Sequence, residues 1–202
     1  MNAHELKLST HLPARAFYAR PTVEVAKDLL GAVLINRTDE GLAAGRIVET
    51  EAYLGQADHA AHSAAGRTPR TQVIYGPPGH AYVYRIYGLH HCLNVVAEPD
   101  GQPGCVLIRA LEPLCGIAAM RQRRATARKV EDIASGPAKL TAAMAIQMGL
   151  YGTDLLMGPL TVRLFNRAQR IEVRRSKRIG ISRSRDLDLR FFIAHNDFVS
   201  RR

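Results

Sequence analysis

Acidic, imidazole and aromatic side chains are crowded into one stretch of this sequence, from Arg46 to Asn94. Five of the seven tyrosines and five of the eight histidines fall inside it, together with Glu49 and Glu51. A carboxylate can act as a general base on water when its surroundings tune its pKa. Flat aromatic faces can stack on a planar ligand such as a nucleobase, at ~1–3 kcal/mol per base. The stretch therefore has the composition of a functional site.

Glu51 is the candidate general base. A strand over residues 45–53 would place Glu49, Glu51 and Tyr53 on one face, because side chains alternate along a strand. The alternative is that both glutamates are exposed residues of an edge strand, since charged strand residues mostly face solvent. Arg109 lies inside an apolar strand expected over 104–113, where an arginine normally needs a partner carboxylate. Glu49 or Glu51 would provide that partner.

Aromatic residues from three segments could form the walls of a pocket. Tyr53, His62 and Tyr84 would come from a strand, a loop and a second strand, although tyrosines on strands are more often half-buried sheet residues. Tyr87 stands beside Gly88 at the expected tip of a hairpin. A side chain there could fill the gap that an extruded nucleotide leaves in a duplex. The alternative is a turn tyrosine that packs on its own hairpin.

The histidines allow a second interpretation, a zinc or other transition-metal centre. Its possible ligands lie on one loop and two strands: His59, His62, His90, His91, Glu49 and Glu51. Adjacent histidines on a strand point to opposite faces, so His90 and His91 cannot easily share one ion. The three cysteines show no C-x-x-C spacing and indicate neither a disulfide framework nor a cysteine zinc site. The pattern favours a site without a metal.

Positive charge is concentrated in the C-terminal part of the chain. The net charge is +10, but residues 1–120 carry 10 Lys and Arg against 11 Asp and Glu, while residues 121–202 carry 18 against 7. This asymmetry is expected of a nucleic-acid binder, the alternative being a merely cationic surface. Candidate contacts to a phosphate backbone are Lys139, near the start of an expected helix, and Arg178. No apolar run approaches the ~18 residues that span a bilayer, and no signal peptide is recognisable, so we expect a cytoplasmic protein without membrane contact.

Local patterns predict the elements that must position these residues. Residues 1–20 show no clear period and are treated as an N-terminal arm. Helical spacing is predicted over 22–30, 116–128 and 137–148, and strands over 32–36, 45–53, 81–87, 89–96, 104–113, 161–165, 171–182 and 189–195. Residues 55–78 form a long irregular loop, of the kind that is usually functional or mobile. We expect one α+β domain over 1–202, with a curved, mostly antiparallel sheet, a protruding β-hairpin and a few packed helices.

Several linked motifs resemble the alkyladenine (3-methyladenine) DNA glycosylase family of base-excision repair. They are VETEAYLG, AAHS, TPR, the Y-V-Y-x-I-Y-G hairpin that leads to Asn94, VLIRALEP and SGPAKL, in this order. The resemblance covers residues ~20–195. It implies that Glu51 is the general base that activates the water attacking C1′ of a damaged nucleotide. Arg109 and the backbone near Ile179 would help to hold that water.

The resemblance also implies how a flipped base is held. Tyr53, His62 and Tyr84 would form the pocket around it, and Tyr87 would be the intercalating wedge. Asn94 would gate the pocket against the exocyclic amino group of guanine. The mammalian members of the family carry bulkier aromatic residues beside the hairpin, where this chain has His90 and His91, and they have a long N-terminal extension; both differences bear on the substrate range.

The expected reaction is hydrolysis of an N-glycosidic bond. The alkylated base carries positive charge, which already weakens that bond. No lysine lies between Lys27 and Lys129, so the pocket segments offer no amine for a Schiff base, and we expect a monofunctional glycosylase without metal or organic cofactor. The expected partner is double-stranded DNA with a damaged purine, bound by a monomer at the bacterial nucleoid. Two other classes stay open: a non-enzymatic nucleic-acid-binding protein and a metal-dependent nuclease.

Overall fold

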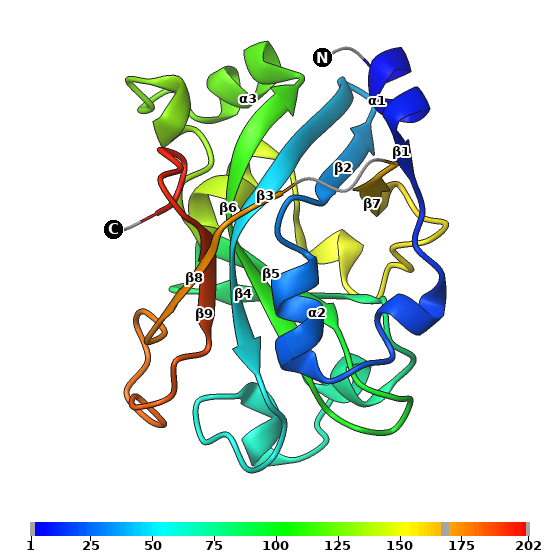
Figure 1. The fold of residues 1–202 in the computed structure, drawn as a ribbon, viewed down its shortest axis with the longest axis vertical. Coiled ribbons are helices and arrows are strands. Elements are labelled where there is room, and N and C mark those ends of the chain that lie inside the picture. The colour runs from blue at the N-terminus through cyan, green and yellow to red at the C-terminus, as the bar shows by residue number, and fades with distance from the viewer. Residues whose placement is uncertain (1–2, 167–169, 201–202) are drawn as a thin grey trace.

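Two long neighbouring strands, β3 (Gly41–Tyr53) and β6 (Cys105–Cys115), form the centre of the fold. The computed structural model describes residues 3–166 and 170–200 (Figure 1). β3 and β6 pair antiparallel, and their register shifts around Glu49. Such irregularities bend a strand and re-aim side chains, and they are frequent next to active sites. The irregularity therefore lies in β3, the strand that carries Glu49 and the candidate base Glu51.

The remaining strands extend this pair on both sides. The order is β1-β7-β2-β3-β6-β5-β4, β9 also pairs with β3, β8 pairs with β9, and all these pairings are antiparallel. The further strands are β1 (Thr10–His11), β2 (Val33–Thr38), β4 (Ala81–Ile86), β5 (His90–Val96), β7 (Leu160–Phe165), β8 (Val173–Ser176) and β9 (Arg190–Ile193). The predicted α+β class with a mostly antiparallel sheet is confirmed.

Short helices pack against this sheet. They are α1 (Ala3–Ser9), α2 (Thr22–Asp28), α3 (Ile117–Arg123) and α4 (Pro137–Ala143), with 3-10 turns η1 (Arg15–Phe17), η2 (His62–Ala65), η3 (Gln72–Tyr75), η4 (Val130–Asp132) and η5 (Met148–Leu150). α2 lies in front of the sheet in Figure 1 and buries Val25 and Ala26. The hydroxyl of Thr50 on β3 donates to the Ala26 carbonyl over 2.8 Å. This bond ties α2 to the strand that carries Glu51.

The structure corrects the expectation of an N-terminal arm. α1 is followed by β1, which pairs with β7 through Thr10 and Phe165. Leu6 is buried beside Val33 and Ile35. These elements are too short to show a period in the sequence, and their stability comes from packing on distant strands. The chain therefore contributes to the domain from residue 3 onward.

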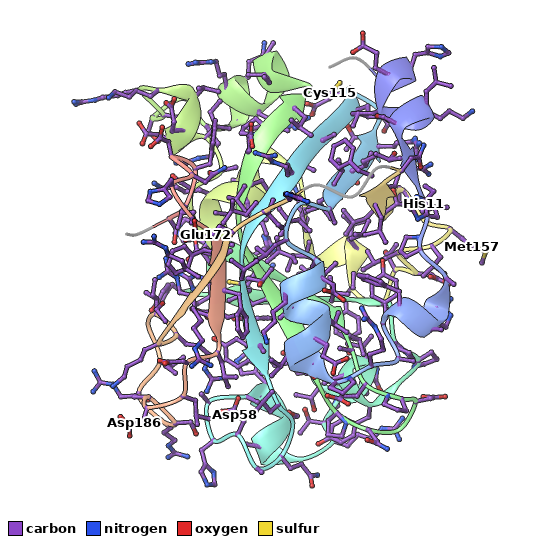
Figure 2. All side chains as sticks on the ribbon, viewed as in Figure 1. His11, Asp58, Cys115, Met157, Glu172 and Asp186 are labelled. Atoms are coloured by element: carbon purple, nitrogen blue, oxygen red, sulfur yellow. The ribbon has the colours of Figure 1, made fainter. Side chains whose placement is uncertain are left out.

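Other differences concern the ends of elements. The helices predicted over 116–128 and 137–148 end at Arg123 and Ala143. The strand predicted over 171–182 is limited to β8, and the chain then leaves the sheet. This connection between β8 and β9 carries the exposed Asp186, labelled in Figure 2, and contacts the loop after β3 through an ion pair between Arg178 and Asp58. In the described part of the chain, no helix combines the length and apolar character needed to cross a membrane.

Candidate active site

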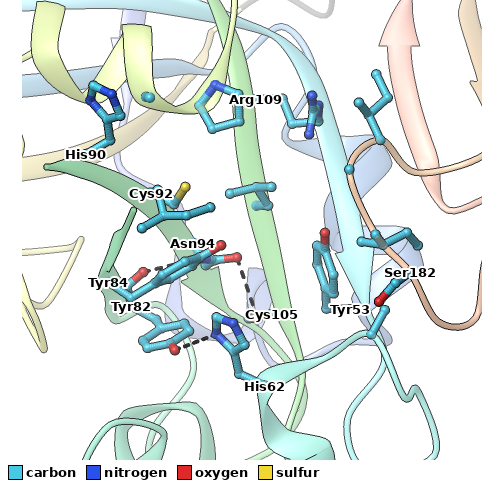
Figure 3. A pocket seen from close by; sticks show the side chains of 18 of the residues that line it. Tyr53, His62, Tyr82, Tyr84, His90, Cys92, Asn94, Cys105, Arg109 and Ser182 are labelled. Carbon is cyan, nitrogen blue, oxygen red and sulfur yellow. Dashed lines mark hydrogen bonds between the residues drawn. The ribbon is translucent and has the colours of Figure 1, made fainter. Parts of the chain in front are cut away.

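A cavity of about 780 Å³ opens between the β4–β5 hairpin, the end of β3 and the segment after β8 (Figure 3). This volume is typical of pockets that enclose a small planar ligand. The predicted site residues that line it are Tyr53, His62, Tyr84, Tyr87, Asn94, Arg109 and Ile179. The structure thus brings together residues from five separate segments of the chain.

Glu51 lies directly behind the wall of this cavity. Its side chain is 0% exposed. Oε2 accepts a hydrogen bond from the Tyr53 hydroxyl (3.0 Å), and Oε1 accepts one from the Ile179 backbone N–H (2.8 Å). Arg109 Nη1 lies 3.2 Å from Oε1. All three donors belong to residues that line the cavity, so the carboxylate is connected to it on three sides.

Burial raises the pKa of Glu51 above its ordinary value of 4.5. The positive charge of Arg109 and the hydrogen bonds from Ile179 and Tyr53 oppose this rise without cancelling it. A general base works best when its pKa lies nearer to the pH at which it operates. The environment of Glu51 therefore suits a carboxylate that takes a proton from water.

Glu49 has a different environment, although it lies on the same strand and is equally buried. Besides Arg109 Nε (3.0 Å), it accepts hydrogen bonds from Arg190 Nε (2.6 Å) and from the backbone and hydroxyl of Ser200 (2.8 and 3.0 Å). Burial alone would raise the pKa of Glu49, but the two arginines and the Ser200 N–H hold it below its ordinary value. Glu49 is therefore a structural anion. The predicted carboxylate partner of Arg109 is confirmed on both glutamates, and the edge-strand alternative is wrong.

The aromatic residues form two walls. Tyr82 and Tyr84 stack with their centroids 5.4 Å apart, and His62 meets the Tyr84 ring edge-on at 4.6 Å. Tyr53 stands across the cavity from them (Figure 3). The opening between Tyr53 and Tyr84 is the place where a flat ring could enter. Tyr82 escaped the sequence prediction, although it shares a strand face with Tyr84.

His62 is neutral at ordinary pH. Burial, followed by repulsion from the Arg70 charge, lowers its pKa to about 4. Its Nδ1 lies 2.8 Å from the Tyr82 hydroxyl, in a hydrogen bond that fixes the ring. A neutral imidazole does not repel a cationic ligand, so the pocket wall is compatible with a positively charged base.

Asn94 is held at the base of the same wall. Its Nδ2 donates to the Tyr82 carbonyl (3.3 Å), and its Oδ1 accepts a weak bond from the Cys105 thiol (3.7 Å). Cys92 and Cys105 both line the cavity. Burial raises the pKa of Cys105 to about 12, so its thiol stays protonated and can act as this donor.

Tyr87 is at the tip of the β4–β5 hairpin, where Ile86 pairs with His90 across a three-residue turn. The residue is 87% exposed, and its backbone has φ of +50°, which is rare for an aromatic residue. Such conformations are often retained at functional sites. The alternative, in which the ring packs on its own hairpin, does not fit this exposure.

The structure does not support one predicted DNA contact. Arg178 is fully buried, and its guanidinium pairs with Asp58, so it is not available to a phosphate backbone. Lys139 is half-buried on the first turn of α4, with Nζ 3.4 Å from the Ser135 hydroxyl. The cations that do line the cavity are Arg70 and Arg183, besides Arg109. Arg70 covers the Tyr84 ring at 5.2 Å, a contact that sequence spacing could not reveal.

The proposed metal ligands do not come together. Within residues 3–166 and 170–200, no group of three or more His, Cys, Asp and Glu side chains is arranged to hold an ion. Glu49 and Glu51 are occupied by arginines, and His62 by Tyr82. The histidines of the stretch from Arg46 to Asn94 therefore do not form one cluster.

These residues form a cavity with aromatic walls beside a buried carboxylate of raised pKa, an arrangement that suits a hydrolase with a planar substrate group. The chain belongs to the methylpurine-DNA glycosylase (MPG) family, whose model matches residues 16–197. It is a monofunctional DNA glycosylase of DNA repair, with DNA as its substrate.

Relatives from distant organisms cover almost the whole chain. A protein of Methanoculleus marisnigri is 52% identical over 194 residues, 95% of this chain and 99% of its own length. One of Koribacter versatilis is 48% identical, over 92% of this chain and 91% of its own. A protein of Oceanobacillus iheyensis is 45% identical, over 93% of this chain and 95% of its own length. All three are named as candidate 3-methyladenine DNA glycosylases.

Proposed function

We propose that this chain, acting as a monomer, hydrolyses the N-glycosidic bond of alkylated purines flipped out of double-stranded DNA and leaves an abasic site. The expected substrates are 3-methyladenine and, beside it, 7-methylguanine, hypoxanthine and ethenoadenine. The observation that carries the proposal is the position of Glu51, a buried carboxylate of raised pKa that contacts the cavity through Tyr53, Arg109 and Ile179. Relatives named for 3-methyladenine support the substrate class.

The flipped base would lie between Tyr53 and the wall of Tyr84 and His62. Burial raises the pKa of both tyrosines, so their rings are neutral phenols. The faces of such rings attract cations, and an N3- or N7-alkylated purine is a cation. Neutral His62 adds no repulsion. Asn94, at the base of this wall, would contact the edge of the purine and reject a guanine amino group.

The chemistry is a displacement at C1′ of the flipped nucleotide. Glu51 takes a proton from a water molecule, the water oxygen bonds to C1′, and the C1′–N9 bond breaks with its electron pair passing to the purine. The alkylated purine thereby loses its positive charge and leaves as a neutral molecule. A neutral substrate such as hypoxanthine lacks this advantage and needs additional help at the leaving group.

The contacts of Glu51 fit this role. Oε1 is held by Arg109 and the Ile179 N–H, whereas Oε2 accepts only from Tyr53 among the described residues. A carboxylate oxygen has two lone pairs, so Oε2 retains an acceptor position for a proton of water. No lysine lines the described cavity, which agrees with a hydrolytic route in place of a Schiff base.

Extrusion of the nucleotide would be stabilised by Tyr87. Its side chain lies at the rim of the cavity and is largely exposed in the part of the chain that the structure describes. An apolar ring inserted into the stack offsets part of the free energy that unstacking costs. The basic surface beyond residue 121 would hold the flanking phosphates.

The test is Glu51→Gln, which removes the base and retains the size of the side chain. We expect single-turnover excision of 7-methylguanine or hypoxanthine from a duplex to fall ~100-fold or more, with binding of the duplex retained. Excision at the unmutated rate would refute the role of Glu51. Retained excision in chelator would exclude a metal-dependent nuclease, and a panel of single-lesion duplexes would rank the substrates.

A further inference from the structure

An ion pair is buried beneath the wall of the pocket. Arg178 Nη2 donates to Asp58 Oδ1 over 2.8 Å, Nη1 donates to Oδ2, and the two side chains are 0% and 1% exposed. Arg178 Nη1 also donates to the Ala52 carbonyl (2.9 Å). Burying two charges costs free energy that their attraction often fails to recover, and apolar side chains of similar volume are often as stable. The pair therefore calls for an explanation other than stability.

Asp58 organises the loop that leads to His62. Its Oδ2 accepts the N–H of Leu54 (3.2 Å) and its Oδ1 accepts the N–H of Ala60 (3.1 Å). The carboxylate thus connects Leu54, directly after β3, with Ala60, which lies two residues before η2 begins at His62. Asp58 therefore holds the start of the loop close to the residues that directly precede His62.

Arg178 organises the other side of the pocket. Its guanidinium covers the Tyr53 ring, with 4.6 Å between the guanidinium carbon and the ring centroid. The next residue, Ile179, donates its N–H to Glu51. The same short segment therefore supports a wall of the pocket and supplies a hydrogen bond to the candidate base.

We propose that Arg178 and Asp58 are a positioning pair, which holds the segment after β8 against the end of β3 so that Ile179 donates to Glu51 and Tyr53 keeps its place. Neither side chain touches the reacting atoms. The inference rests on the proposed function of Glu51. It adds Arg178 and Asp58 as residues that affect catalysis by positioning Ile179 and Tyr53.

Loss of the pair has a distinct electrostatic consequence. The hydrogen bond from Ile179 favours the ionised form of Glu51, so its loss raises the pKa of that carboxyl further. The other charged or titratable groups that influence Glu51 or are influenced by it are Arg109, Glu49, Tyr53, Arg178 and Cys92. Of these, Arg109 stays anchored by Glu49, and Arg178→Lys keeps the positive charge at position 178, so the shift in that variant reports mainly on Ile179 and Tyr53.

The experiment compares Asp58→Asn and Arg178→Lys with Asp28→Asn. The control removes the same charge from an exposed ion pair, Arg20–Asp28. Single-turnover excision of 7-methylguanine is measured from pH 4.5 to 9. For both test variants we expect the acidic limb of the profile to move to higher pH. The plateau rate should fall ~10- to 100-fold, because small displacements at a reacting centre cost rate on this scale. The control should match the unmutated protein.

An acidic limb that stays in place in folded Asp58→Asn would overturn the proposal, because a purely structural pair would not move it. If Asp58→Asn does not fold, Arg178→Lys decides, since it retains the positive charge and loses the bidentate geometry of the guanidinium. Failure of both variants to fold would also overturn the proposal, because the pair would then hold the fold and not the site. Glu51→Gln in the same assay separates the two ideas: normal excision by that variant refutes the proposed function itself.

Discussion

Arg109 lies between Glu49 and Glu51 and contacts both, with Nε 3.0 Å from one carboxylate and Nη1 3.2 Å from the other. One guanidinium cannot neutralise two buried anions. Glu49 has Arg190 as a second cation, whereas the donors to Glu51 besides Arg109, among the residues that the structure describes, are neutral. The pKa of Glu49 is accordingly lowered and that of Glu51 raised. Two glutamates on one strand thus differ in charge state: Glu49 is held as an anion, and Glu51 has the raised pKa expected of the proposed base.

This difference predicts the pH dependence of excision. The proposed base must be ionised, so the single-turnover rate should rise with pH through the pKa of Glu51. Burial places that pKa above 4.5, and the acidic limb should therefore have its midpoint above 4.5. His62, with a pKa of about 4, becomes protonated at the acid end of this range, so a step from His62 should lie at lower pH than that of Glu51. A midpoint at or below 4.5 would contradict the assignment.

Glu49→Gln should destabilise the protein. The substitution leaves Arg109 and Arg190 with an excess of buried positive charge, and breaking a buried pair in this way costs ~3–5 kcal/mol in the free energy of unfolding. Denaturant unfolding measures the effect, with Glu40→Gln as control, because Glu40 is in an exposed pair with Arg123. A loss no larger than in the control would show that the cluster around Glu49 is unimportant for stability.

The same residue predicts a dependence of stability on pH. In the folded state the pKa of Glu49 is lowered from 4.5, so its contribution is complete above 4.5 and is lost as the pH falls through the lower folded value. The unmutated protein should therefore lose more stability on acidification than Glu49→Gln does. Parallel unfolding curves for the two proteins across this range would contradict the shift.

Local sequence pattern was sufficient for most of the central sheet. Alternation predicted the strand of Glu51 and Tyr53, and an arginine inside an apolar strand predicted that Arg109 has a carboxylate partner. The same signal exists for Arg190, which directly precedes Phe191 in the strand predicted over 189–195 and pairs with Glu49 in the structure. Ser200 has no such signal, because its contact with Glu49 joins backbone segments that are distant along the chain.

Arg178 shows why charge alone misleads. It lies in the most basic segment of the chain, where an exposed arginine would contact phosphate, but its guanidinium is turned inward to Asp58. That direction depends on the loop after β3, which has no regular period. Residues 1–20 were difficult to predict for a different reason. Their helix and strand are too short to show a hydrophobic period, and their stability comes from tertiary packing.

Tyr87→Ala should weaken binding of a lesion duplex more than binding of undamaged DNA. The ring is exposed in the free protein, so its removal should leave the melting temperature unchanged. Loss of one stacking contact costs ~1–3 kcal/mol, which corresponds to about 5- to 150-fold in Kd. Fluorescence anisotropy with both duplexes measures it, and Tyr87→Phe is the control that keeps the ring. Equal losses on the two DNAs would argue against a wedge.

Arg70→Gln should raise the pKa of His62. Repulsion from Arg70 is the second cause of the lowered value, after burial, so the pKa should rise from about 4 without reaching the ordinary 6.5. An NMR titration of the His62 imidazole measures the shift. Arg67→Gln removes an exposed cation from the same loop and serves as control. An unchanged pKa in Arg70→Gln would show that burial alone accounts for the neutral imidazole.

Arg183→Ala should reduce the salt dependence of DNA binding. Arg183 lines the cavity on the segment after β8, and we expect it to contact a phosphate of the flanking strand. Each phosphate contact releases counterions, so the slope of log K against log salt should fall by ~1 in magnitude, and lesion and undamaged duplexes should be weakened alike. Lys7→Ala, on α1, is the control and should leave the slope unchanged. If Arg183→Ala weakened only the lesion duplex, the residue would act on the flipped base, and the basic segment would have to hold the backbone through other side chains.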